Sequence, residues 1–242
     1  ERWAEKIFAS GEKFGSALAH QVKDFLRPGL TIEVGSSAGG VLAAFRRIRS
    51  DLEVLGIEPS PREASYAERR GVKTIVTLFE DLAREFPKAE NIMIIRSLNH
   101  LLDPKAFLQW AWHALRPEGR LVVAVQDFRL SAKKKGSVSA ATQIDHTYMF
   151  TRETLKNFVT AAGFDILFYD ASEGRSFREW TAMRKGGLTD HLRLVVKKSS
   201  REPFGGNAVV PLGRGIHRSL SRWRLQRYCL FFHLYRALLE RP

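Results

Sequence analysis

Small and acidic residues follow two apolar segments of this chain in an order that suits the binding of a nucleoside. Glu33 lies near the end of the first segment, before a turn of small residues at 35–40, and Glu58 ends the second segment 18 residues after Gly40. Small residues between a strand and a helix let a ligand approach the backbone and leave a helix N-terminus to face it. A carboxylate at the tip of the neighbouring strand can accept hydrogen bonds from two ribose hydroxyls. The residues therefore predict a nucleoside site, against the plain alternative of a strand, turn and helix without a ligand.

The turn also helps to separate two classes of cofactor. A dinucleotide site of the G-x-G-x-x-G type needs a second glycine so that a pyrophosphate can lie against the backbone, and Ser37 occupies that position. Gly40 fills the third glycine position, so the pattern alone does not decide between the classes. Glu33 would repel a pyrophosphate and attract a ligand that carries an amino group and a sulfonium. The charge of Glu33 therefore favours the second class.

Alternating apolar segments predict the elements that position these residues. We expect strands at about 30–35, 53–58, 73–76, 91–95, 120–126, 164–170 and 191–197. We expect helices at about 4–25, 39–49, 61–70, 80–86, 103–116 and 151–162. Such alternation is typical of an α/β fold in which helices cover both faces of a mostly parallel sheet. Ligands of these sheets bind beyond the carboxyl ends of the strands, where Gly35, Glu58 and Arg96 all fall.

Three segments interrupt the alternation. Residues 127–150 form a long excursion from the end of a strand, where active-site lids occur, and carry three lysines at 133–135. These lysines are either a solvated loop tip or a means of steering an anionic substrate. Residues 171–190 form a second excursion. A linker containing Gly and Pro, at 199–215, precedes a last helix of about 25 residues.

The C-terminal part of the chain carries most of its charge. The 242 residues have a formal net charge of +13, and residues 184–242 contribute 13 Lys and Arg against 3 Asp and Glu, or +10. The last helix mixes aromatic residues with arginines, and its apolar core at 228–235 is shorter than the roughly 20 residues that span a bilayer. Such a helix can lie on a membrane surface, bind a partner or a second copy to form an oligomer, or dock on its own domain. We predict three parts, namely an N-terminal helical segment (1–27), an α/β domain (28–198) and a linker with a basic amphipathic C-terminal helix (199–242).

The cysteine content of the chain indicates the kind of cellular compartment in which the protein resides. Cys229 is the only cysteine, which excludes a disulfide within the chain and disfavours structural zinc, so we expect no metal site. A reducing compartment fits this content, and we expect a cytoplasmic protein, peripheral at the inner face of a membrane if the last helix binds lipid. Because the chain begins with Glu1 rather than Met, we expect its true start and any targeting signal to precede it.

Five sequence elements, in order, resemble those of the class I S-adenosylmethionine-dependent methyltransferases over residues 28–198. They are Glu33-Val34-Gly35-Ser36-Ser37-Ala38-Gly39, Gly56-Ile57-Glu58-Pro59-Ser60, Asn99-His100-Leu101-Leu102-Asp103-Pro104, Leu115-Arg116-Pro117-Glu118-Gly119-Arg120-Leu121, and Tyr148-Met149-Phe150-Thr151 leading to Ala161-Ala162-Gly163-Phe164. The resemblance implies S-adenosylmethionine as the cofactor. It also implies a Rossmann-like seven-stranded sheet whose last strand, at 191–196, runs antiparallel to the rest.

The resemblance also assigns binding roles. It places Glu33 and Gly35 against the methionine part of the cofactor, Glu58 at the ribose and the segment 78–81 along the adenine. Arg96 and Ser97 would line the methionine end and the mouth of the substrate pocket. The cofactor-binding residues expected on this basis are Glu33, Gly35, Ser36, Ser37, Gly39, Glu58, Pro59, Leu78, Phe79, Glu80, Arg96 and Ser97.

Three residues depart from the family's pattern. Ser37 stands where glycine is most common, and Leu78 where a polar side chain often reads the adenine amine. Asn99 stands where a glutamate commonly precedes the histidine. We expect the last change to remove a carboxylate from the rim of the active site.

Transfer of a methyl group to a hydroxyl needs a base that removes the proton. The candidate catalytic residues are His146, His100, Tyr148 and Asp145. Asp145 is a plausible orienting neighbour for His146, and Tyr148 could hydrogen-bond the substrate or the cofactor. His100 alone is better explained as a helix-cap or core histidine at the exit of a strand.

The resemblance and the candidate bases together favour a methyltransferase that acts, by in-line displacement, on an oxygen of a small-molecule, glycan or lipid-linked acceptor, which could be anionic. Two alternatives stay open. One is a nucleic-acid methyltransferase, which the net charge favours and which the absence of an Asn/Asp-Pro-Pro-aromatic tetrapeptide and of a core cysteine disfavours. The other is a non-catalytic scaffold subunit with the same fold.

Overall fold

A computed structural model describes residues 2–82, 86–144, 146–171, 181 and 183–204 of the chain. Contacts divide the chain into Glu1–Ala208 and Val209–Pro242. The second part, which includes the predicted C-terminal helix, lies outside the described residues, as does Asp145. All the described helices and strands belong to the first part.

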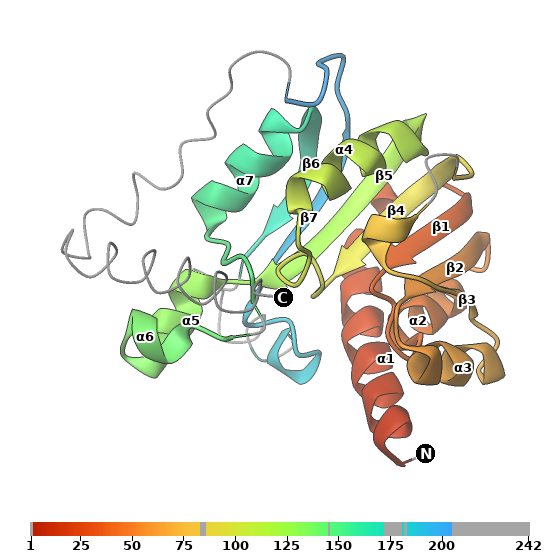
Figure 1. Cartoon of the computed structure of the whole chain (residues 1–242), viewed down its shortest axis with the longest axis horizontal. Coiled ribbons are helices and arrows are strands. Elements are labelled where there is room, and N and C mark those ends of the chain that lie inside the picture. Colours follow the sequence, from red (N-terminus) through yellow and green to blue (C-terminus); the bar gives the residue numbers. More distant parts are fainter. Residues whose placement is uncertain (1, 83–85, 145, 172–180, 182, 205–242) are drawn as a thin grey trace, which may run out of the picture. The chain divides into compact units, whose positions relative to one another are not determined.

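A mixed sheet forms the centre of this part, with the strand order β3-β2-β1-β4-β5-β7-β6 (Figure 1). The strands are β1 (Gly29–Val34), β2 (Leu52–Glu58), β3 (Lys73–Val76), β4 (Ala89–Ile95), β5 (Leu115–Gln126), β6 (Phe164–Asp170) and β7 (His191–Lys198). Strand β7 runs antiparallel to β5 and β6, and the pairs among β1 to β5 are parallel. The predicted fold class is therefore confirmed, including the antiparallel last strand.

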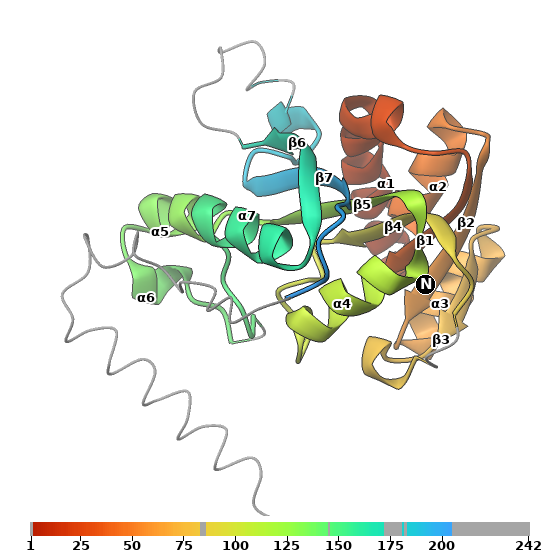
Figure 2. The same ribbon diagram turned by 90° about the horizontal axis from the view of Figure 1, so that it is seen from above.

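Helices cover both faces of the sheet (Figure 2). The described helices are α1 (Arg2–Val22), η1 (Lys23–Phe25), α2 (Gly40–Ile48), α3 (Pro61–Arg69), η2 (Phe79–Asp81), α4 (Pro104–Ala114), α5 (Phe128–Lys135), α6 (Val138–Ala141) and α7 (Arg152–Ala161). Helices α1 and α2 share one hydrophobic core with one face of the sheet, and α4 and α7 share another core with the opposite face. None of the helices that the structure describes is long and apolar enough to cross a membrane.

Successive apolar residues of the central strands supply both cores. On β4, Ile92 and Ile94 enter the core beneath α4 and α7, whereas Met93 and Ile95 enter the core beneath α1 and α2. A strand that is buried on both faces reads as a continuous apolar run, which is why β4 was recognisable from the sequence. The order of the strands reverses direction between β1 and β4, and this is where a sheet of this kind leaves a crevice for ligands.

Helix α1 packs closely on the start of α2 through glycines. A Cβ atom on Gly15 would lie 2.8 Å from the Cα atom of Val41, and one on Gly40 would lie 2.2 Å from the carbonyl oxygen of Phe8. Both contacts are with backbone, which cannot move aside as a side chain can. The two helices therefore approach more closely than larger residues would permit.

Two predicted segments differ in the structure. Where a helix is expected at 80–86, the structure has a single 3₁₀ turn, η2, that ends before the extended residue Leu82 (φ −60°, ψ 127°), and residues 83–85 lie outside the described part of the chain. The excursion 127–150 is not an open loop, since it contains α5 and α6. Asp127 caps the start of α5 and Gly136 (φ 75°) ends it, so the lysines at 133–135 form a helical turn rather than a loop tip.

Candidate functional site

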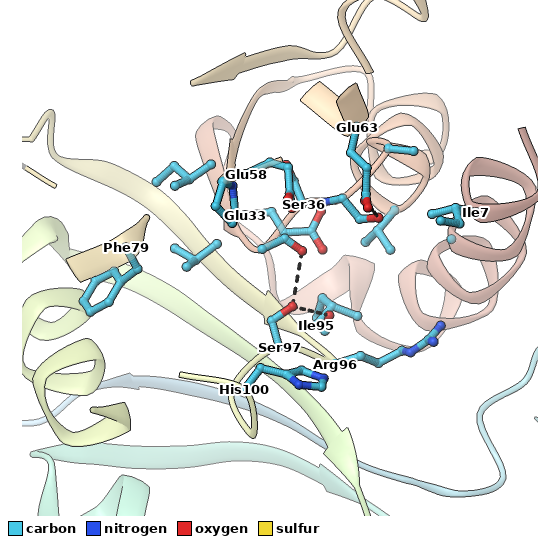
Figure 3. Close-up of a pocket in the computed structure, with 18 of the residues that line it drawn as sticks. Ile7, Glu33, Ser36, Glu58, Glu63, Phe79, Ile95, Arg96, Ser97 and His100 are labelled. Atoms are coloured by element: carbon cyan, nitrogen blue, oxygen red, sulfur yellow. Dashed lines mark hydrogen bonds between the residues drawn. The ribbon is translucent and has the colours of Figure 1, made fainter. Parts of the chain in front are cut away.

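A pocket of about 880 Å³ opens at the carboxyl ends of β1, β2 and β4 (Figure 3). Its volume lies within the roughly 300–1,000 Å³ that is usual for small-molecule sites. With the exception of Gly39, all the residues predicted to bind the cofactor line it, together with His100. Gly39 (φ 82°) lies behind the turn, where a Cβ atom would meet the side chain of Ala67 at 2.8 Å.

The turn after β1 needs a glycine at position 35. Gly35 has a φ of 74°, and a Cβ atom there would lie 2.4 Å from the Oγ atom of Ser97. The Ser97 hydroxyl lies 3.2 Å from the carbonyl oxygen of Gly35 and 3.3 Å from that of Ile95 (Figure 3). These contacts join the ends of β1 and β4 and form the floor of the pocket.

Ser37 occupies a backbone conformation that favours glycine. Its φ is 50°, which is uncommon for a residue with a side chain. Its amide donates to Oε2 of Glu58 at 2.8 Å, and its hydroxyl donates to the Glu63 carboxylate. Two acidic side chains thus hold the serine that replaces the family's usual glycine.

Glu58 ends β2 with both carboxylate oxygens directed at backbone amides. Oε2 accepts from Ser37, and Oε1 accepts from the amide of Ser60 at 2.9 Å. Burial raises the pKa of Glu58, and the two amide donors oppose that rise. Each carboxylate oxygen has a second lone pair, so the group can still accept hydrogen bonds from a ligand's hydroxyls.

Glu33 presents a buried carboxylate to the pocket. Its side chain is 1% exposed, and its Oε2 atom has no hydrogen-bond partner among the described residues. Burial, and secondly the charge of Glu58, raise the pKa of Glu33 well above its usual range. An unpaired buried carboxylate is costly, and a cationic group of a ligand would supply the missing partner. Ser36 adds a second buried oxygen that lacks a partner in the described part of the chain.

The segment after β3 forms the apolar end of the pocket. The Leu78 side chain is half exposed at its edge. Phe79 lines the pocket but is buried against Phe107 and Trp110, with ring centroids 5.4 and 5.5 Å apart. Phe79 therefore anchors the segment in the core beneath α4, and the side of the pocket that it supports can receive a flat apolar group.

The candidate bases lie together on the other side of the pocket. His100 lines the pocket, and the ring of His146 meets it edge-on with 4.8 Å between centroids. Tyr148 lies close by, where its amide donates to the carbonyl oxygen of Asn99 and its hydroxyl donates to that of Leu102 at 3.3 Å. Asp145 lies outside the described residues. The structure thus brings together His100, His146 and Tyr148.

The side chain of Asn99 does not lie at the rim of the pocket, where we expected it. Its side chain is 4% exposed, and it is not among the residues that line the pocket. A residue at this position faces the interior, so the expected loss of a carboxylate from the rim is wrong.

Helix α1 contributes a wall that we did not predict. Its first turns line the pocket with Trp3, Lys6, Ile7, Ser10 and Gly11. The sequence predicts this helix as part of a separate N-terminal segment (1–27). Its amphipathic pattern indicates that one face is buried, but does not indicate which other element covers that face. Gly11 and Gly15, four residues apart on one helical face, were the available signal for close packing.

Metal-binding groups are not assembled in the described part of the chain. No cluster of three or more His, Cys, Asp or Glu side chains there could hold a metal ion.

Comparisons with known proteins agree with this site. A family described as a methyltransferase domain matches residues 8–168. No curated protein matches the chain.

Several solved structures share the fold. An S-adenosylmethionine-dependent methyltransferase from Clostridium acetobutylicum ATCC 824 is 11% identical, with a TM-score of 0.58 over 77% of this chain and 91% of that one. The plantazolicin methyltransferase BpumL in complex with SAH is 16% identical, with a TM-score of 0.54 over 79% and 83%. A chain from the complex of the Haloferax volcanii Trm112 methyltransferase activator with a methyltransferase is 17% identical, with a TM-score of 0.59 over 82% and 96%. At these identities the likeness is one of fold.

Proposed function

Because the chain belongs to the methyltransferase-domain family, we propose that it transfers the methyl group of S-adenosylmethionine to an oxygen of a small-molecule, glycan or lipid-linked acceptor. The observation that carries the cofactor assignment is the buried carboxylate of Glu33, which faces the pocket without a hydrogen-bond partner in the described part of the chain. A ligand with an ammonium and a sulfonium supplies the positive charge that this group lacks. The SAH complex of the plantazolicin methyltransferase, which shares the fold, supports the same cofactor class.

The remaining residues of the pocket fit the other parts of this cofactor. Glu58 would accept hydrogen bonds from the ribose hydroxyls, and the apolar end at Leu78 would receive the adenine. When bound, S-adenosylmethionine supplies an activated methyl carbon, so the protein need not build one. The task left to the chain is to hold the acceptor in line and to remove its proton.

We infer that His100 performs the second task. Its exposed ring lines the pocket, and an unprotonated ring nitrogen would accept the proton of the acceptor hydroxyl. The edge-on contact with His146 would orient that ring. General bases of this kind typically contribute a factor of about 10²–10⁴ to a rate.

The first test is calorimetric titration of the full chain with S-adenosylhomocysteine. We expect micromolar binding that Glu58→Ala weakens by at least about tenfold, since each lost charge-assisted hydrogen bond is worth roughly 1.5–3 kcal/mol. Glu53→Ala is the matched control, because Glu53 lies on the same strand but is exposed. Equal affinity of the two variants, or no binding at all, would contradict the cofactor assignment.

Methyl transfer is tested next, with radiolabelled S-adenosylmethionine and pooled hydroxyl compounds. We expect His100→Ala to lower the rate of transfer while leaving the affinity for S-adenosylhomocysteine nearly unchanged. Intact cofactor binding without transfer to any acceptor would favour the non-catalytic scaffold instead. The solved complex with an activator protein shows that a methyltransferase of this fold can bind a protein partner.

A further inference from the structure

Charge is divided between two sides of the pocket. Four glutamates line it, namely Glu33, Glu58, Glu63 and Glu80. Arg96 and His100 follow β4, and Figure 3 shows them across the pocket from Glu58 and Glu63. The glutamates suit the cationic nucleoside, and the arginine needs a separate explanation.

The backbone of Arg96 is held in an uncommon conformation at the end of β4. Its φ is 64°, and its amide donates to the carbonyl oxygen of Ala124 on β5 at 2.7 Å. Non-glycine residues in this region of φ are strained, and such strain gathers at functional sites. Arg96 therefore stands, with its backbone fixed, directly after the end of β4 and lines the same pocket as Ser97.

An aromatic ring supports the Arg96 side chain. Its Cζ atom lies 5.6 Å from the ring centroid of Phe14 on α1. Behind that ring lies His191, at the start of β7, with 5.0 Å between the two ring centroids. Burial, and secondly the charge of Arg96, lower the pKa of His191 to about 4. The charge of Arg96 therefore acts on an uncharged imidazole.

The carboxylates at this end of the sheet have other partners. Asp127 pairs with Arg152 at 3.4 Å, Asp170 with Arg193 at 2.9 Å, and Asp190 with Lys134. Glu33 is perturbed by the charge of Glu58, whereas the charge of Arg96 acts on His191. Arg96 itself is exposed and forms no ion pair with any described residue.

We propose that Arg96 binds an anionic group of the methyl acceptor, a carboxylate or a phosphate. A guanidinium can hold either group through two parallel hydrogen bonds, which fixes orientation as well as position. Because His100 lies four residues further on and lines the same pocket, an acceptor held by Arg96 would present its hydroxyl on the side of the base. The proposal rests on the proposed function and adds a substrate class to it.

The competing role for Arg96 is to hold the carboxylate of the cofactor itself. The two roles predict different behaviour in the complex with S-adenosylhomocysteine. If Arg96 serves the acceptor, its guanidinium stays available in that complex. If it serves the cofactor, the guanidinium is occupied.

The test is a titration of the full chain, saturated with S-adenosylhomocysteine, with inorganic phosphate and with acetate. The Nε–H resonance of Arg96, identified by its loss in Arg96→Gln, is followed by NMR, with sodium chloride at equal ionic strength as the reference. We expect a saturable shift with phosphate or acetate that chloride does not produce. Since the proposal gives Arg96 to the acceptor and not, as the resemblance implied, to the cofactor, we also expect Arg96→Gln to change the affinity for S-adenosylhomocysteine by less than about twofold. Arg129→Gln, which alters an exposed arginine of α5, is the control.

Two results would overturn the proposal. One is an Arg96 resonance that shifts when S-adenosylhomocysteine is added and then no longer responds to either anion. The other is an Arg96 resonance that never responds to anions. Failure of S-adenosylhomocysteine to bind would contradict the proposed function instead, and the anion titration of the free protein would still report on Arg96.

Discussion

Glu33 illustrates how a single residue can weaken the fold in order to serve the site. Its carboxylate is buried among apolar strands with one oxygen unpartnered in the described part of the chain, so its ionised form is disfavoured until a cation arrives. The folded protein keeps the Glu33 proton to a higher pH than the unfolded chain does, because burial raises the pKa of the group. The folded state consequently loses stability as the pH rises above the ordinary range of a glutamate.

Substitution of Glu33 by Gln tests whether the buried carboxylate lowers the stability of the fold. We expect Glu33→Gln to raise the free energy of unfolding by about 1 kcal/mol or more at pH 8, since one unit of pKa shift corresponds to roughly 1.4 kcal/mol. At pH 5 the gain should be smaller, because the wild-type group is then closer to neutral. The measurement is urea denaturation of the free protein at both values of pH, followed by titration with S-adenosylhomocysteine.

The same variant should bind S-adenosylhomocysteine more weakly, since a neutral amide attracts an ammonium less than a carboxylate does. Glu53→Gln, on the exposed side of β2, should change neither property. A loss of stability that is equal at both values of pH would mean that Glu33 is a structural residue with a satisfied carboxylate.

At the scale of elements, the pocket depends on how closely α1 approaches α2. The contact runs along the helical face that carries Gly11 and Gly15, and it brings the first turns of α1 to the pocket. Both positions are in a helix, where alanine is more favourable than glycine by about 1 kcal/mol. Gly11 and Gly15 differ in how much space is available for an added Cβ atom.

Alanine at these two positions should therefore have opposite effects. We expect Gly15→Ala to lower the free energy of unfolding by about 1–3 kcal/mol, because the added Cβ atom would lie 2.8 Å from the Cα atom of Val41 and would force the helices apart. Gly11→Ala should be neutral or stabilising, since its closest contact, the Cα atom of Gly40, is 3.4 Å away. Thermal and urea denaturation of the two variants makes the comparison, and equal effects would show that this interface tolerates repacking.

The whole molecule combines an acidic pocket with a strongly basic C-terminal part. Residues 184–242 account for +10 of the formal net charge of +13. A basic segment of this kind attracts anionic surfaces over about a Debye length, roughly 10 Å at 0.1 M salt. The basic C-terminal part and the glutamates of the pocket thus carry charges of opposite sign.

Vesicle binding tests the role of the basic part. We expect the full chain to sediment with vesicles that contain phosphatidylserine, but not with vesicles of phosphatidylcholine alone, and to be released as salt is raised. Affinity for S-adenosylhomocysteine should stay nearly constant over the same salt range, because Glu33 and Glu58 are buried. Duplex DNA of equal charge is the comparison, and tighter, steeply salt-dependent binding to DNA would revive the nucleic-acid alternative.

The sequence by itself determined the strands and the cofactor side of the site. Continuous apolar runs such as that of β4 identify strands buried on both faces. The residues at 33–37 span the end of β1 and the turn after it, so they are close in space because they are close in the sequence. At the start of the helix expected at 80–86 the structure has a single 3₁₀ turn that begins at Phe79, and the contact of Phe79 with Phe107 of α4 joins distant segments and could not be read from local periodicity.

Tertiary structure alone decided the acceptor side. His100 and His146 are far apart in the chain, and their edge-on contact depends on the path of α5 and α6. The wall contributed by α1 depends on glycine packing against α2, and the backbone of Arg96 is fixed by a hydrogen bond to β5. Periodicity and local motifs report which residues a segment buries, but not which distant segment covers them. That pairing follows from the packing of side chains between elements, so it can be read only once the elements are in place.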